Sequence, residues 1–295
     1  MSALIIEETT RNRGGFMDYI IMKENVETFR RQLISEEKSA GTIEKYMREV
    51  KVLLDFMMGK EWKKEMLIAY KQFLSEKYAT ATVNSFLVAA NRFVVFVGRA
   101  DLKVKLHKVQ KQIFADQEKE LSKEEYMRLV ITAQKQGNQR LALVLQTICG
   151  TGIRVSELRF ITAEAVKRGQ AEVRCKGKNR IIFLPEKLQR RLRDYMAKTG
   201  IKKGAIFITK SGKSLDRSNI WNEMKKLCEE ASVPREKVFP HNLRHLFARV
   251  FYNMEKDIAK LADLLGHSSI ETTRIYIMES GELHRRKLNQ MRLIL

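Results

Sequence analysis

Apolar residues recur every three to four positions over most of the first hundred residues of this chain. One series runs from Ile43 to Met57, another from Val83 to Val97, and residues 64–78 lie between them with a similar pattern. This spacing places apolar side chains on one face of a helix, and that face must be buried against other helices. Residues 20–106 are therefore predicted to form a small all-helical domain, preceded by a mobile leader over residues 1–19.

The composition changes after this predicted bundle. Residues 107–119 are basic and lack a helical period, which is typical of a linker between domains. Ser122 and Glu125 then have the spacing of a capping box and predict the start of a new helix. A chain of 295 residues is long enough for two domains, so we expect a second domain over residues 120–295.

The second domain mixes helical and strand-like segments. Three short segments, 161–166, 171–175 and 180–184, have β character and predict a small antiparallel sheet. The turn between the last two is dense in lysine, with Lys176 and Lys178 on either side of Gly177. The predicted fold class is mainly α with a small antiparallel β-sheet, divided into a helical N-terminal domain and a mixed α/β domain.

The chain is strongly basic, with 56 Lys and Arg against 35 Asp and Glu and a formal net charge of +21. This excess favours a nucleic-acid partner. No apolar run approaches the roughly 20 residues that span a bilayer, and the N-terminus lacks a secretory signal. We therefore expect a cytoplasmic protein with no membrane association. The three cysteines are widely spaced and form no zinc motif, and there is no P-loop, so no metal and no cofactor are expected.

Chemically active side chains are concentrated between residues 240 and 277. His241 and Arg244 are three residues apart and share a helix face, whereas His245 is expected on another face. His267 follows a glycine at a predicted helix end, and Tyr276 is predicted about two turns into the next helix. Arginine neutralises a phosphate, histidine moves a proton and tyrosine attacks as an oxygen nucleophile, so this group suits phosphoryl transfer.

Each of these residues also has an ordinary structural interpretation. A tyrosine in a helix is usually a core residue with a bonded hydroxyl. Arg154, after the Gly150–Gly152 turn, fits a surface position as well as a phosphate site, and a lysine in a turn usually serves solubility. The residues taken singly leave both interpretations open.

The combination is more specific. The sequence contains TGIRVSEL at 151–158, HNLRH at 241–245, LGH at 265–267 and TTRIY at 272–276. In these motifs, their order and their spacing, the chain resembles the tyrosine recombinase (phage integrase) family in its short two-domain, Xer-like form. The resemblance covers nearly the whole length. It implies a helical, SAM-like core-binding domain and a catalytic domain that close together around double-stranded DNA.

The resemblance also implies a catalytic set, namely Arg154, Lys176, His241, Arg244, His267 and Tyr276. The tyrosine would attack the scissile phosphate and form a 3′-phosphotyrosyl link, while the two arginines hold the non-bridging oxygens. The first histidine would assist proton transfer and the second would hydrogen-bond the phosphate. The lysine would protonate the leaving 5′-oxygen, with Lys178 as the alternative to Lys176. Glu157 is expected to support the fold.

The implied function is site-specific DNA recombination in integration, excision or resolution, without ATP or metal. The implied assembly is a homo-tetramer on DNA with specific core sites, and a monomer or weak oligomer without DNA. The C-terminal tail, 282–295, would dock on a neighbouring protomer, although packing on its own domain remains open. Two alternatives are a type IB-like topoisomerase, which needs no partner site, and a DNA-binding regulator on the same scaffold. A pure binder would not need to keep all six residues.

Overall fold

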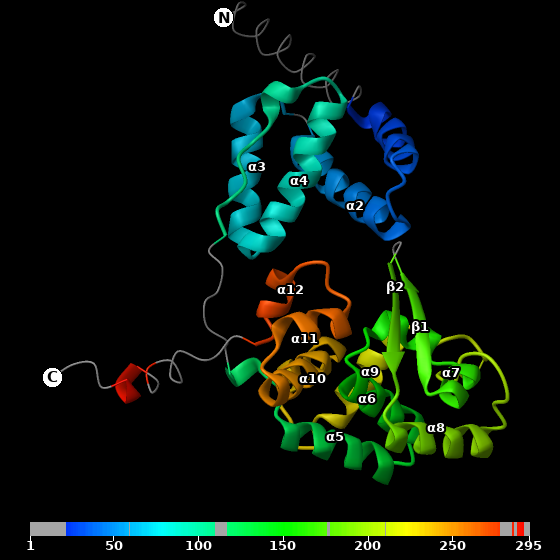
Figure 1. Cartoon of the computed structure of the whole chain (residues 1–295). Helices are drawn as coiled ribbons and strands as arrows, with labels where there is room; N and C mark the ends of the chain where they lie inside the picture. The colour runs from blue at the N-terminus through cyan, green and yellow to red at the C-terminus, as the bar shows by residue number, and fades with distance from the viewer. Residues whose placement is uncertain are drawn as a thin grey trace, which may run out of the picture. The chain divides into compact units, whose positions relative to one another are not determined.

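The computed structural model describes residues 22–58, 60–109, 117–175, 178–209, 211–277, 285 and 288–291. The chain divides into two compact units, the first ending at residue 111 and the second beginning at residue 112 (Figure 1). The leader predicted over residues 1–19 and most of the tail predicted over 282–295 lie outside the described residues.

The first unit is a helical bundle. A helix over residues 22–35 is followed by α2 (Ala40–Met57), α3 (Lys64–Lys77), α4 (Thr80–Phe96) and the short 3-10 helix η1 (Ala100–Leu102). Each apolar stripe faces the interior, and the largest enclosed side chains are aromatic: Phe29, Trp62, Tyr70 and Phe93. The helices predicted from the 3–4 residue spacing are confirmed.

Beyond α4 the chain runs in extended form along the bundle as a strap, residues 103–108 (Figure 1). The Asn91 side chain donates to the Val104 carbonyl at 2.8 Å and accepts from the Val104 amide at 2.9 Å. Asn84, two turns earlier on α4, makes the same pair of bonds to His107 at 2.9 and 2.8 Å. Each asparagine supplies one donor and one acceptor, as a neighbouring strand would. The segment predicted as a linker, 107–119, thus begins at a residue held on the first unit.

The second unit is built on one continuous core. Its elements are η2 (Gln117–Lys119), α5 (Lys123–Lys135), α6 (Gln139–Thr151), η3 (Val155–Phe160), α7 (Ala163–Arg168), β1 (Gln170–Cys175), β2 (Lys178–Phe183), α8 (Glu186–Thr199), α9 (Arg217–Leu227), η4 (Arg235–Lys237), α10 (Pro240–Glu255), α11 (Ile258–Leu265) and α12 (Ile270–Arg274). Helix α6 is central and packs against α5, α8, α9 and α10. All five residues from Leu141 to Leu145 are buried, as expected for a helix enclosed on all sides.

The predicted antiparallel sheet is present as a two-stranded hairpin in which β1 pairs with β2 from Gln170↔Phe183 to Cys175↔Lys178. The strand predicted over 161–166 is wrong, because residues 163–168 form helix α7. Its β-branched residues gave the strand signal. However, the Thr162 hydroxyl accepts from the Ala165 amide at 3.1 Å and caps a helix start, and Gly169 ends the helix in the left-handed region.

The capping box predicted at Ser122 and Glu125 is confirmed at the start of α5. The glycine of the TGIR motif also has a clear structural cause. Gly152 ends α6 with φ +64°, and a Cβ at that position would lie 2.4 Å from the Phe247 ring of α10. Glycine therefore permits both the left-handed turn and the close approach of α10.

Candidate active site

Helix α10 carries His241 and His245, and the rings of both lie close to Tyr276. Pro240 occupies its first turn, which suits a residue without an amide proton. The His241 and His245 ring centroids are 4.8 Å apart, and the His245 ring lies 4.2 Å from that of Tyr276. The prediction that His245 lies on a different face is therefore wrong, because residues four apart on a helix are neighbours, as residues three apart are.

Arg244 is the most enclosed cation of the site, with 1% of its surface exposed. Its guanidinium donates to the carbonyl of Gly152, to that of Leu265 at 2.7 Å and to Nε2 of His267 at 2.9 Å. A guanidinium only donates, so Nε2 of His267 is the acceptor. The proton of this imidazole then lies on Nδ1, which is 2.8 Å from the Thr273 hydroxyl. The Nε of Arg244 is buried and has no hydrogen-bond partner within the described residues.

Tyr276 lies just beyond α12, because that helix is only five residues long and is capped by Ser269. The predicted position two turns into a helix is therefore wrong, and the residue itself is 3% exposed. Its hydroxyl is 3.3 Å from Nε2 of His241, and its ring stacks on His267 at 5.4 Å between centroids. The structure thus gathers Tyr276, His241, Arg244 and His267, four of the six predicted residues, in one place.

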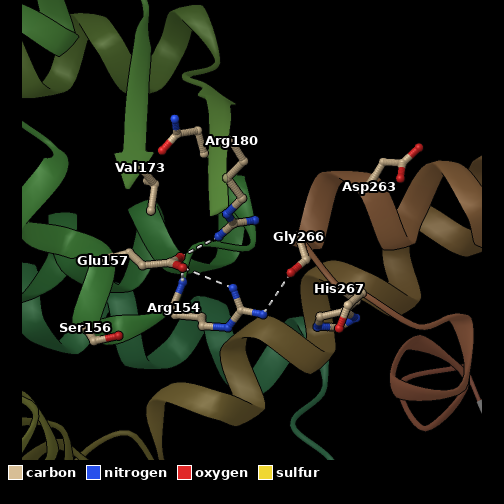
Figure 2. A pocket seen from close by; sticks show the side chains of 10 residues that line it. Arg154, Ser156, Glu157, Val173, Arg180, Asp263, Gly266 and His267 are labelled. Atoms are coloured by element: carbon tan, nitrogen blue, oxygen red, sulfur yellow. Dashed lines mark hydrogen bonds and ion pairs between the residues drawn. The ribbon is translucent and has the colours of Figure 1, made fainter. Parts of the chain in front are cut away.

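Arg154 enters the same region from η3. Its amide donates to Oε2 of Glu157 at 2.9 Å, and its guanidinium donates to Oε1 at 3.0 Å and to the Gly266 carbonyl at 3.4 Å (Figure 2). Burial opposes ionisation of Glu157, but the Arg154 amide and the Arg180 guanidinium outweigh it and hold the pKa of this carboxyl below its usual range. Glu157 therefore acts as an anion that orients Arg154.

The second residue bound by Glu157, Arg180, was not predicted as part of the site. It lies on β2 and donates to Glu157 and, at 2.6 Å, to the Leu264 carbonyl. Side chains alternate along a strand, so Arg180 shares a face with Ile182, which is buried. A charge at an inward position of the predicted strand was the signal that could have identified it.

The side chains of Arg154, Glu157, Arg180 and His267 line a pocket of about 560 Å³ (Figure 2). Its walls include η3, the hairpin and the turn after α11: Arg154, Ser156, Glu157, Val173, Asn179, Arg180, Asp263, Gly266, His267 and Ser268. Arg154 and Arg180 line this pocket together with His267, whose Nε2 accepts from Arg244 at 2.9 Å. A pocket of this charge suits a phosphate group.

The histidines of the site are held in their neutral form. Enclosure by neighbouring atoms and the charges of nearby arginines lower the pKa of His245 and that of His267 to about 4. The same causes, enclosure first and Arg244 next, lower the pKa of His241. Burial and Arg154 lower the pKa of Arg244 to about 10, which still leaves it charged at neutral pH. The site therefore combines fixed positive charge with neutral imidazoles that can accept a proton.

The lysine remains a prediction. Lys176 lies outside the described residues, and for Lys178 the structure describes the backbone, as the first residue of β2, but not the side chain. In the described part of the hairpin, Cys175 of β1 pairs with Lys178 of β2.

Within the described residues, no group of three or more histidine, cysteine, aspartate or glutamate side chains is arranged to hold a metal ion. In the same part of the chain, no helix combines the length and the apolar character needed to cross a membrane.

The sequence of this chain is similar to those of known proteins. Residues 119–282 match the sequence profile of the phage integrase family. Tyrosine recombinase XerC of Roseiflexus castenholzii is 31% identical over 281 residues, which cover 86% of this chain and 88% of that protein. Tyrosine recombinase XerA of Thermococcus kodakarensis is 27% identical over 281 residues, which cover 92% and 96% of the two chains.

Solved structures give the same fold. A crystal structure of XerA recombinase is 26% identical, with a TM-score of 0.51 over 93% of this chain and 100% of that one. A lambda integrase tetramer bound to a Holliday junction is 15% identical, with a TM-score of 0.72 over 88% of this chain and 78% of that one. A XerH recombinase bound to its difH substrate in a post-cleavage complex is 18% identical, with a TM-score of 0.69 over 90% and 83%.

The chain belongs to the phage integrase family. Within that family it is a tyrosine recombinase of the Xer-like kind, an enzyme of site-specific DNA recombination. The predicted family, fold class and enzyme class are confirmed.

Proposed function

We propose that this recombinase cleaves and rejoins DNA through a 3′-phosphotyrosyl intermediate on Tyr276. The observation that carries the proposal is the 3.3 Å contact between the Tyr276 hydroxyl and Nε2 of His241, a ring whose pKa is lowered. A neutral imidazole at hydrogen-bond distance can take the phenolic proton as the oxygen attacks.

The step balances without an external reactant. The Tyr276 oxygen forms a bond to the scissile phosphorus, and the bond from phosphorus to the 5′-oxygen breaks. His241 takes the phenolic proton, and the ammonium of Lys176, or of Lys178, gives a proton to the 5′-oxygen. The phosphotyrosyl ester keeps the energy of the broken bond, so a 5′-hydroxyl of another strand can reverse the step without ATP.

Arg154 and Arg244 neutralise the non-bridging oxygens, where charge develops during the displacement. His267 lines the same pocket and hydrogen-bonds the phosphate. Its Nε2 accepts from Arg244 in this structure, so this role requires that nitrogen to gain a proton when the phosphate arrives.

The DNA complex is also a proposal. The first unit serves as the core-binding domain (20–106), residues 107–119 link it to the catalytic domain (120–295), and the two close around a specific core site in the cytoplasm. Four protomers assemble on two sites, with the tail, 282–295, docked on a neighbour. Support comes from relatives of the same fold, since XerH is seen bound to difH and lambda integrase as a tetramer on a Holliday junction.

The decisive experiment uses Tyr276→Phe and DNA that flanks the gene of this chain. Wild-type protein should become covalently attached at one mapped sequence, and the variant should bind that sequence without forming an adduct. Covalent product from the variant would refute the assignment of the nucleophile. Relaxation of plasmids that lack the mapped site would favour a topoisomerase, and absence of any wild-type adduct would favour a DNA-binding regulator.

Salt dependence provides a second test. Binding that neutralises many phosphates releases counterions, so affinity should fall steeply with salt concentration. Titrating the mapped duplex at several salt concentrations between about 50 and 200 mM measures how steeply the affinity falls. A flat response would contradict DNA as the partner.

A further inference from the structure

Arg180 has an unusual place for a charged side chain. It is the third residue of β2, directly opposite Val173 of β1, and it lies on the inward face of the hairpin. Only 12% of its side chain is exposed, whereas Ile181 and Phe183 on the outer face are exposed by 49% and 65%. A buried cation is costly unless partners satisfy it, so its contacts explain why it can be there.

Those contacts tie together three separate elements. The guanidinium donates to the Glu157 carboxylate on η3 (Figure 2). It also donates, at 2.6 Å, to the Leu264 carbonyl at the end of α11. The stem of the side chain packs under the turn that follows, because a Cβ on Gly266 would lie 2.6 Å from Cδ of Arg180. The absence of a side chain at Gly266 therefore leaves the room that Arg180 fills.

The position of the hairpin depends on such ties. A two-stranded hairpin is at best marginally stable by itself, so its place is fixed by what its inner face contacts. The catalytic lysine is proposed for the turn of this hairpin, and Arg180 is two residues from Lys178 on the same strand. The two partners of Arg180 also lead to residues that line the pocket: Glu157 orients Arg154, and the turn after Leu264 carries His267.

We propose that Arg180 is a positioning residue that holds the lysine-bearing hairpin against Glu157 and the Leu264–His267 turn during strand cleavage. This inference rests on the proposed function, in which a lysine of that turn protonates the leaving 5′-oxygen. The two guanidinium arms of Arg180 are bonded to Glu157 and to the Leu264 carbonyl, so it acts by holding these elements together. Its effect on the rate passes through the lysine.

The leaving group provides the test. A duplex of the mapped site is prepared with either oxygen or sulfur as the 5′ bridging atom of the scissile phosphate. A thiol has a pKa of about 8.5, so it departs as a thiolate without a proton from the lysine. Single-turnover adduct formation is measured on both duplexes, together with DNA affinity and the thermal midpoint of each variant.

Arg180→Met should slow cleavage of the oxygen duplex by about tenfold or more, within the range that general-acid catalysis supplies. The defect should shrink to less than about threefold on the sulfur duplex, because the mispositioned acid is no longer needed. Arg174→Met is the matched control: this arginine lies on the same hairpin with 76% of its side chain exposed, and it should leave both rates unchanged. Lys176→Ala and Lys178→Ala are the references, and the one that removes the acid should be rescued by sulfur.

Arg180→Lys guards against a variant that fails to fold. It keeps the charge and the stem, but a single ammonium does not reproduce the two-armed contact of a guanidinium, so an intermediate defect with rescue by sulfur is expected. Equal losses on the two duplexes, or no loss on the oxygen duplex, would overturn the inference.

Failure of the underlying function looks different. If neither lysine variant is slowed, the general acid is misassigned and the inference falls with it, while the Tyr276→Phe result still decides the nucleophile. If the lysine variant is rescued by sulfur and Arg180→Met is not, the proposed chemistry stands and only the role of Arg180 is wrong.

Discussion

The two units of this protein bury different kinds of side chain. The first encloses aromatic rings such as Phe29, Trp62 and Phe93, and among its described residues the one buried charge is Glu49, which accepts from Ser85 at 2.8 Å. The second unit encloses Arg244 and Glu157, at 1% and 2% exposure, beside its histidines. Burying a charged side chain costs folding free energy. Buried charges grouped beside histidines in the second unit therefore indicate a site that serves the reaction at the expense of stability. Substitutions in the second unit should therefore slow the reaction, and those in the first should weaken the fold.

The largest expected effect is on the reaction. Arg244→Lys removes a forked donor set that an ammonium does not reproduce, and adduct formation should fall by about 10³-fold or more. The measurement is single-turnover cleavage of the mapped duplex at saturating protein. Arg128→Lys is the control, since Arg128 also donates to two main-chain carbonyls, of Ala231 and Ser232 at 3.0 and 3.1 Å, but away from the site. Comparable slowing in the control would mean that the loss arises from folding.

The next effect is on the stability of the first unit. Phe93→Ala empties a fully buried position whose ring meets Phe29 at 5.4 Å, and it should cost about 3–5 kcal/mol. The chain has two tryptophans, so in a Trp221→Phe background the fluorescence of Trp62 reports unfolding of the first unit alone. Val95→Ala, at a position that is 46% exposed, should have little effect. If folded Phe93→Ala protein, saturated with DNA, also loses more than about tenfold in cleavage rate, the division between the units is wrong.

A smaller loss is expected at the strap. Asn91→Ala leaves the amide and carbonyl of Val104 without their partners, and the first unit should lose about 1–3 kcal/mol. The same Trp62 fluorescence measures it. Gln72→Ala removes an amide whose contact to Glu76, at 3.4 Å, is long and exposed, and serves as the reference. Equal stability of the two variants would show that the asparagine bonds do not hold the strap.

The smallest effect concerns pH. His245 and His267 have a pKa of about 4 in the folded protein against an ordinary value of 6.5, so the unfolded chain binds more protons between these values. Stability of the second unit should therefore be full above pH of about 6.5 and decline as pH falls toward 4. Partial exposure of these rings limits the size of the loss. Chemical denaturation at several pH values, followed at Trp221 in a Trp62→Phe background, would measure it, and stability that rises on acidification would contradict the neutral histidines.

Much of this architecture follows from local sequence. The first-unit helices and the cap at Ser122 rest on short-range spacing, and the structure contains them. The motifs predicted that His241, Arg244, His267 and Tyr276 belong together, and the structure gathers them, although Tyr276 lies after α12 instead of two turns into a helix. The strand predicted over 161–166 is wrong because the hydroxyl of Thr162 caps a helix that begins at Ala163.

Other features depend on contacts that spacing does not contain. Arg180 meets Glu157, 23 residues away, and Leu264, 84 residues away, so no local pattern connects them. The cluster of His245 with Tyr276 likewise requires α10 and the segment after α12 to pack together. Long-range pairing of this kind is what the fold adds to the sequence.

The strap has a consequence for how this protein can vary. Asn84 and Asn91 grip main-chain atoms of His107 and Val104, and neither bond involves a strap side chain. The side chains of Lys103, Lys105 and Lys108 point into solvent. Substitution of these three lysines can therefore change the charge of the strap, and with it the attraction of this segment to a polyanion. Such substitutions would not move the point at which the chain leaves the bundle.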